Sequence, residues 1–385
     1  MTEFDAITWR FEQQFQCQPE VVCRAPGRVN LIGDHTDYNQ GFVLPAAIDV
    51  GTTIAASLGE GNQVCVMAMD YTDEIDNFAL DNITFSYDSM WRNYVRGTLA
   101  CLKQHFEGIA GVNMVVTGNV PQGAGLSSSA SFEIAILKAI AVLYQLDLNG
   151  VKAALIGQQA ENDFVGCNCG IMDQLVSALG LAGHAMLLDC RSLSYQDVPI
   201  PKGLVLMVVN SNIQRGLVDS EYNSRRQQCE EVAKTLHVEA LRDLSLEQLE
   251  TAKDSLPEVH FRRARHVITE NTRTLDAMHA LQANDLTLLG QLMAQSHASL
   301  KEDYQVTTPE LDGLVDMIDA VVDSNGGARM TGGGFGGSVV ALMPEEKVAD
   351  VIAAVEEGYS LRFGLVADIH QFKASAGAFR GSNTA

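Results

Sequence analysis

A glycine- and serine-rich stretch, Pro121-Gln-Gly-Ala-Gly-Leu-Ser-Ser-Ser-Ala-Ser131, constrains this chain more than any other feature. Ahead of it, apolar and polar residues alternate over 112–117, which predicts a strand. Behind it, apolar residues recur at helical spacing over 132–143 and form one apolar stripe. The stretch therefore joins a strand to the N-terminus of a helix.

The composition of this loop suits an anion. Gly123 and Gly125 let the backbone approach a ligand closely, because neither residue has a Cβ. The first-turn amides of the helix point outward unpaired, beside the positive end of its dipole. Serines at 127, 128, 129 and 131 add hydroxyls, and a serine N-cap would explain one or two of them but not four. The loop is therefore predicted to bind phosphate.

Several other phosphate loops and active-site motifs are excluded. The chain has no Gly-Lys dipeptide, so it lacks the G-x-x-x-x-G-K-[ST] loop. The His-Arg-Asp and Asp-Phe-Gly signatures of protein kinases are also absent. A serine-hydrolase elbow fails because no glycine stands two residues after Ser127. A glycine-serine loop of another family remains.

The size and charge of the chain restrict its organisation and partners. Its 385 residues favour two domains, and we place the boundary near residue 200, where Pro199 and Pro201 interrupt the pattern, giving domains 1–200 and 201–385. The net charge of −22 argues against nucleic acid or an anionic membrane surface as a partner. No apolar run is long enough to span a membrane and the N-terminus lacks a signal-peptide pattern, so we expect a cytoplasmic protein.

A second polar stretch runs from Pro26 to Tyr38. It contains two glycines, and its second half places Asp34, His35 and Asp37 close together. Short polar side chains beside a glycine suit a neutral polyol, which needs several fixed donors and acceptors. A surface turn capped by Asp and Thr explains the composition equally well, and a metal site is a weaker alternative because the spacing matches no common ligand pattern.

Three later features complete the pattern. Residues 332–337, Gly-Gly-Gly-Phe-Gly-Gly, satisfy G-x-G-x-x-G, but a strand follows at 338–342 where a dinucleotide site requires a helix. This loop could instead bring backbone to the same ligand from the other domain. Asp173 falls in the first turn of a helix predicted over 171–179, where a carboxylate is stabilised by the dipole in any case. The arginines at 225–226 and 262–265 are interpreted as solvated helix faces.

These stretches together resemble the GHMP family of small-molecule kinases, and within it the galactokinases. Residues 27–45 resemble the galactokinase signature, 121–131 the ATP loop of the family and 332–337 its third motif. Residues 167–174 and 220–226 are also similar to galactokinase segments. The resemblance implies a two-domain protein of α/β and α+β type, with a ribosomal-S5-like N-terminal domain, a ferredoxin-like C-terminal domain and the site between them.

The resemblance also implies an activity and a set of site residues. The expected reaction is ATP-dependent phosphorylation of galactose at its anomeric hydroxyl to galactose 1-phosphate, the first committed step of galactose catabolism, by a monomer that uses galactose and MgATP. Asp173 corresponds to the catalytic aspartate and Arg28 to its partner, while Ser129 and Glu161 correspond to Mg²⁺ ligands. The sugar-binding positions are Asp34, His35, Thr36, Asp37 and Tyr222. The ATP-binding loop positions are Gly123, Ala124, Gly125, Leu126, Ser127, Ser128 and Ser129.

One residue departs from the family pattern. The signature carries glutamate where this chain has Asp34, which is one methylene shorter, so either water fills the gap or the sugar preference differs. A kinase for a related sugar such as N-acetylgalactosamine is one alternative. Another is a non-catalytic galactose sensor, but the fungal relatives of that kind lose a Ser-Ala dipeptide that is present here as Ser129-Ala130.

Overall fold

The structure, a computed structural model, describes residues 2–213 and 218–380. The N-terminal half is built on a five-stranded sheet in the order β1-β3-β6-β4-β5, in which every neighbouring pair is antiparallel except β4 and β6. Its strands are β1 (Val21–Asn30), β3 (Pro45–Leu58), β4 (Gln63–Ala68), β5 (Glu74–Ala79) and β6 (Val112–Gly118).

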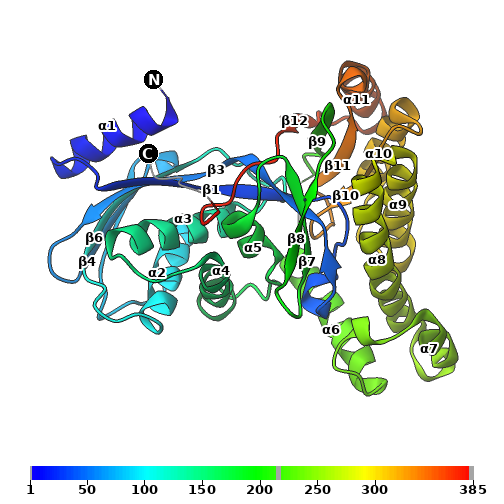
Figure 1. Cartoon of the computed structure of the whole chain (residues 1–385), viewed down its shortest axis with the longest axis horizontal. Helices are drawn as coiled ribbons and strands as arrows, with labels where there is room; N and C mark the ends of the chain where they lie inside the picture. The colour runs from blue at the N-terminus through cyan, green and yellow to red at the C-terminus, as the bar shows by residue number, and fades with distance from the viewer. Residues whose placement is uncertain (1, 214–217, 381–385) are drawn as a thin grey trace.

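Helices cover both faces of this sheet (Figure 1). On one face lies α1 (Glu3–Phe15), whose Ile7 and Phe11 pack against Met67 and other apolar side chains of the sheet. On the other face lie α2 (Met90–Lys103), α3 (Ser128–Leu143), α4 (Gly150–Gln159) and α5 (Met172–Leu179). Helix α3 is apolar over most of its surface, which fits its central place between the sheet and the neighbouring helices.

The C-terminal half has a four-stranded antiparallel sheet in the order β10-β11-β9-β12. Its strands are β9 (Leu204–Asn210), β10 (Gly327–Thr331), β11 (Ser338–Pro344) and β12 (Asp368–Phe372). Helices α6 (Val218–Thr235), α7 (Leu246–Thr251), α8 (Glu258–Ala283), α9 (Leu286–Ser299) and α10 (Pro309–Val322) separate β9 from β10. Since α11 (Val348–Phe363) separates β11 from β12, the elements follow the β-α-β-β-α-β order of a ferredoxin-like domain.

The two halves are joined by more than the chain connection. A small sheet of β2 (Phe42–Val43), β7 (His184–Asp189) and β8 (Tyr195–Pro199) lies near their junction, where α8 packs against β2 and β8. One apolar core contains residues of both halves, among them Leu31, Val340 and Met293. The boundary near residue 200 stays a prediction, and the halves that it separates share a core.

The segment that follows β12 returns to the N-terminal half (Figure 1, red trace). The backbone N–H of Ser375 donates to Ala47 O at 2.9 Å, and that of Ala378 donates to Ser177 O at 3.0 Å. Ala378 is fully buried in the core around α3, with Phe379 packed beside it. Residues 373–380 thus pack as part of the N-terminal half, although they follow the C-terminal half in the sequence.

The interpretation of the arginines as solvated helix faces is wrong for two of them. Arg225 and Arg263 are buried, with exposures of 7% and 3%. Arg225 donates to the carbonyl of Tyr304 at 2.9 Å, and Arg263 donates to that of Asp303. These carbonyls lie in a π-helical turn (Leu300–Tyr304) after α9. The changed backbone hydrogen-bond pattern of this turn leaves carbonyl oxygens free to accept from the arginine side chains of α6 and α8. In the described ranges no helix has the length and apolar character needed to cross a membrane.

Candidate active site

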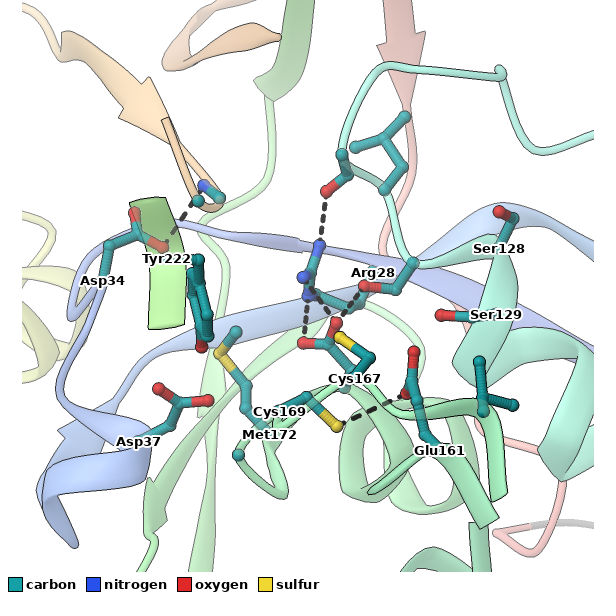
Figure 2. Close-up of a pocket in the computed structure, with 18 of the residues that line it drawn as sticks. Arg28, Asp34, Asp37, Ser128, Ser129, Glu161, Cys167, Cys169, Met172 and Tyr222 are labelled. Atoms are coloured by element: carbon teal, nitrogen blue, oxygen red, sulfur yellow. Dashed lines mark hydrogen bonds and ion pairs between the residues drawn. The ribbon is translucent and has the colours of Figure 1, made fainter. Parts of the chain in front are cut away.

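A cavity of about 510 Å³ lies where three loops meet. These are the phosphate loop (121–129), the sugar loop (33–38) and the third glycine loop (332–337), and Gly332 and Gly333 bring backbone to the cavity from the C-terminal half. Figure 2 shows Asp34, Asp37 and Tyr222 at one end, Ser128, Ser129 and Glu161 at the other, and Arg28 between them. The predicted site residues that line the cavity are Arg28, Asp34, His35, Asp37, Gly123, Gly125, Leu126, Ser127, Ser128, Ser129, Glu161, Asp173 and Tyr222.

Two predicted residues do not line the cavity. Thr36 is fully buried, and its hydroxyl lies 2.7 Å from both Gly33 O and Phe42 O, so it holds the sugar loop in shape. Ala124 is also fully buried, and its carbonyl accepts a hydrogen bond from the Ser338 hydroxyl at 2.8 Å. Both residues belong to loops that line the cavity, and their assignment as binding positions stays a prediction, because a motif does not reveal which way each side chain points.

The phosphate loop leaves the start of α3 open. Gly123 and Gly125 have φ of +73° and +72°, a region that glycine enters without strain. Ser127, the N-cap of α3, has φ of +59° and makes no side-chain capping bond. Its hydroxyl donates instead to Asp173 on α5. The first-turn amides therefore receive no capping bond from Ser127, beside the positive end of the dipole, as an anion site requires.

An ion pair occupies the middle of the cavity. The Arg28 guanidinium donates from Nε to Asp173 Oδ1 and from Nη2 to Asp173 Oδ2, both at 2.7 Å. Its third nitrogen donates to Gly125 O at 2.6 Å, which joins the pair to the phosphate loop. Arg28 lies on β1 and Asp173 in the first turn of α5. This fork geometry fixes the direction in which the carboxylate faces the cavity.

Asp34, at the sugar end, has a partner that sequence reasoning missed. Arg329 on β10 is fully buried and donates to Asp34 Oδ2. Asp34 Oδ1 accepts from Asn30 Nδ2 at 3.0 Å and from the Gly332 amide at 3.3 Å. Arg329 lies three residues before the glycine stretch at 332–337. A charged residue among mostly apolar neighbours was the available sign that it has a buried partner.

Helix α8 holds the backbone of the same loop. The Gly33 amide donates to Glu270 Oε1 at 3.0 Å, and His266 Nε2 lies 3.1 Å from Asp34 O. Burial raises the pKa of Glu270, but the charge of Arg273 and other neighbours outweighs this effect and lowers the pKa to about 2. Glu270 is therefore a buried carboxylate that acts as a fixed acceptor.

The remaining sugar-end residues combine rings with a carboxylate. His35 has φ of +65°, and its ring centroid lies 5.5 Å from that of Tyr222. Burial lowers the pKa of His35 well below its usual value, so the imidazole is neutral at pH 7. Burial and the charge of Asp173 raise the pKa of Asp37 to about 6. This end offers a ring surface, a neutral imidazole and carboxylate acceptors.

Glu161 lies opposite the phosphate loop, in a π-helical turn (Ala160–Val165) that continues α4. Such turns occur often at functional sites. Burial raises the pKa of Glu161, and the negative charge of Asp173 raises it further, whereas hydrogen bonds from Cys169 and Ser129 lower it. A buried carboxylate beside a hydroxyl is a donor set that fits a divalent cation. Within the described ranges, no three or more His, Cys, Asp or Glu side chains are grouped to hold a metal.

Beyond the phosphate loop, Met90, Tyr94 and Val165 also line the cavity. Sequence reasoning did not find this end, because Met90 and Tyr94 are indistinguishable from ordinary residues of an amphipathic helix.

Three family signatures match the chain. Residues 10–58 match the galactokinase galactose-binding signature, residues 93–181 the N-terminal domain of GHMP kinases and residues 277–361 their C-terminal domain. The chain is also similar to the crystal structure of Lactococcus lactis galactokinase complexed with galactose, with 36% identity and a TM-score of 0.93, over 98% of this chain and 99% of that one.

More distant structures share the fold. Methanococcus jannaschii mevalonate kinase is 19% identical with a TM-score of 0.65, over 92% of this chain and 98% of that one. Homoserine kinase from Cytophaga hutchinsonii is 15% identical with a TM-score of 0.61, over 93% and 96%. The matched signatures and the 36% identity over nearly the whole length lead to one assignment: the chain belongs to the galactokinases of the GHMP kinase family.

Proposed function

We propose that the chain transfers the γ-phosphoryl group of ATP, with Mg²⁺, to the anomeric hydroxyl of galactose. The observation that carries this proposal is the Arg28–Asp173 pair, which lies between an open helix N-terminus and a polar, ring-bearing end of one cavity. Phosphoryl transfer needs mainly the positioning of the phosphate donor and the acceptor hydroxyl, and the stabilisation of charge between them. The proposed site needs no residue from a second copy, which is compatible with a monomer as the working unit, and the use of ATP suits the cytoplasm.

The sugar would bind at the end that carries Asp34, His35, Asp37 and Tyr222. Asp34 already accepts bonds from Arg329, Asn30 and Gly332, so it would act as an oriented acceptor with little freedom to move. Carboxylates at two positions suit a ligand with several hydroxyls, each of which can donate. Tyr222 would contact an apolar face of the ring.

The nucleotide would bind at the other end. Its phosphates would meet the amides at the start of α3 and the hydroxyls of Ser128 and Ser129. The side chains of Met90, Tyr94 and Val165 would contact the adenine base, which requires an apolar surface.

Asp173 would face the hydroxyl that attacks. Arg28 holds both carboxylate oxygens and Ser127 donates to one of them, so the carboxylate can orient the sugar hydroxyl and accept its proton as the new bond forms. The guanidinium, which also touches the phosphate loop, can stabilise negative charge on the phosphoryl group in transit.

Ser129 and Glu161 would hold the magnesium ion. One carboxylate and one hydroxyl leave most of the coordination sphere to water and phosphate oxygens, which is how Mg²⁺ is usually bound beside nucleotides. When bound, the ion would neutralise charge on the phosphates.

The test is direct. The protein is incubated with MgATP and each common hexose, and the product is identified by phosphorus NMR. We expect galactose 1-phosphate from galactose and little product from the other hexoses. A product phosphorylated at another hydroxyl would refute the proposed orientation of the sugar, and no product from galactose would refute the substrate.

A further inference from the structure

A buried network lies behind Glu161. Gln174 Nε2 donates to Glu161 Oε2 at 2.7 Å and to Glu133 Oε2 at 3.0 Å. Gln174 and Glu133 are fully buried, and Glu161 is 6% exposed. One amide nitrogen carries two hydrogens, so it can donate to both carboxyl groups at once. The three side chains come from α3, the π-helical turn and α5, so the network ties these elements together.

Glu133 is not explained by the reaction. It does not line the cavity, and burial raises its pKa well above the usual range, with a further rise from the charge of Glu161. An acid at this depth is costly where an apolar residue would pack without penalty. Glu133 Oε2 accepts the hydrogen bond from Gln174, while its other oxygen has no partner among the described residues. Holding the Gln174 amide is therefore the role that its geometry supports.

The same network leaves one oxygen of Glu161 for a ligand. Oε2 accepts from Gln174 and, at 3.4 Å, from the Cys169 thiol. Figure 2 shows the other oxygen turned toward Ser129 and the cavity. A carboxylate fixed by one oxygen presents the second in a set direction, which a free glutamate would not do.

The packing around the network is close. Gly157 on α4 lies against it, because a Cβ there would come within 3.2 Å of Gln174 Cγ and 3.3 Å of Glu133 Oε2. Gln174 also directly follows Asp173 in α5. A shift of the amide would therefore disturb both Glu161 and the first turn that carries Asp173.

We propose that Glu133 is a positioning residue for the divalent cation: it fixes the Gln174 amide, which in turn fixes the Glu161 carboxylate. This inference rests on the proposed role of Glu161 as a cation ligand. Outer partners of metal ligands typically change metal affinity by about 10–100-fold when they are removed.

The experiment measures Mn²⁺ binding, by electron paramagnetic resonance of the free ion, in the presence of a non-hydrolysable ATP analogue. Glu133→Gln keeps an acceptor oxygen for Gln174, whereas Glu133→Met has a similar shape without one. We expect Glu133→Met to weaken Mn²⁺ binding about tenfold or more, and Glu133→Gln to stay within about threefold of wild type. Galactose binding, measured by calorimetry, should change little in either variant.

Further variants separate position from stability. Gln174→Met should weaken Mn²⁺ binding as Glu133→Met does, and the double variant should be no weaker than either single one, because both remove the same link. Leu137→Ala, in the buried face of the same helix, should lower the urea concentration at which the protein unfolds and leave Mn²⁺ affinity unchanged. If Glu133→Met does not fold, Gln174→Met decides the same question.

Two outcomes overturn different statements. Glu161→Ala with weakened Mn²⁺ binding, together with wild-type binding in Glu133→Met or Gln174→Met, would refute the positioning role alone. Wild-type Mn²⁺ binding in Glu161→Ala would refute the cation ligand and the positioning role together.

Discussion

At the scale of single residues, the hydrogen bonds from Arg28 and Ser127 determine how the Asp173 carboxylate is held. The carboxylate receives two hydrogen bonds from Arg28 and one from Ser127, which hold it in one orientation. This arrangement suits a loose transition state, in which the attacking hydroxyl loses its proton late.

Asp173→Asn should abolish turnover while the protein folds and binds galactose. The amide is nearly isosteric but cannot accept the proton, and a positioned base typically contributes about 10²–10⁴-fold. Steady-state kinetics and galactose calorimetry check this. A kcat above about one tenth of wild type would show that Asp173 only orients the hydroxyl.

Arg329→Met should destabilise the protein and weaken galactose binding. The guanidinium is fully buried against Asp34, and removing one member of a buried pair typically costs about 3–5 kcal/mol because it leaves the other charged and unpaired. Urea unfolding gives the free energy, and kinetics should show a higher KM for galactose. The double variant Asp34→Asn, Arg329→Met is the control and should lose less stability than Arg329→Met alone.

The residues that carry motifs were predictable, whereas their partners were not. Arg28, Asp173 and the phosphate loop stand in short patterns whose residue types suit their chemistry. Arg329 pairs with a residue 295 positions away, and local periodicity contains no information on such contacts. The contacts of Thr36 were hidden for the same reason, because only the folded loop shows that its hydroxyl faces backbone carbonyls.

At the scale of elements, predictions succeeded where burial gives a clear period. The strand expected at 112–117 is β6, and the helix expected at 171–179 is α5, which begins at Met172. The π-helical turn at Glu161 was not foreseen, because the helical pattern of residues continues through it. Strand β10 was missed since Gly327 and the charged Arg329 break the apolar run.

Helix α8 stabilises the sugar loop in a pH-dependent way through Glu270. Its folded pKa of about 2 lies below the ordinary 4.5, so its contribution is complete above pH 4.5 and is lost as the pH falls toward 2. The full contribution is on the order of 3 kcal/mol. The difference in unfolding free energy between wild type and Glu270→Gln, measured in urea, should shrink by about 2 kcal/mol from pH 5 to pH 3.

The exposed Glu250 provides the control for this measurement. For Glu250→Gln the difference from wild type should be small and should stay nearly constant over the same range. A constant difference for Glu270→Gln as well would show that the buried carboxylate does not have the lowered pKa.

At the scale of the whole molecule, two domains were predicted, and each half of the chain has its own main sheet with helices. The two halves nevertheless share one apolar core, and the segment 373–380 crosses from the second half back to the first. Composition and proline positions can indicate where a chain divides. They cannot show that a later segment crosses back, because that depends on contacts between distant residues.

Gly377→Ala tests how much the returning segment stabilises the molecule. A Cβ at Gly377 would come within 2.5 Å of the backbone of Ala178, so the segment must shift, at a cost of about 1–3 kcal/mol. Urea unfolding measures this loss. Gly118→Ala, where the Cβ would make ordinary contacts at 3.5 Å, is the matched control and should change stability much less. Equal effects would mean that the segment is not tightly held.

The returning segment also has a consequence for synthesis on the ribosome. Residues 1–200 leave the ribosome first, but the carbonyls of Ala47, Ser177 and Ala178 receive their partners only when residues 375–379 emerge. At about 5–20 residues per second, that delay is roughly 10–40 s. During this time α5, which carries Asp173, lacks the hydrogen bonds that the returning segment donates to its C-terminal end. The nascent chain should therefore acquire a fully ordered catalytic site only after residues 375–379 have emerged.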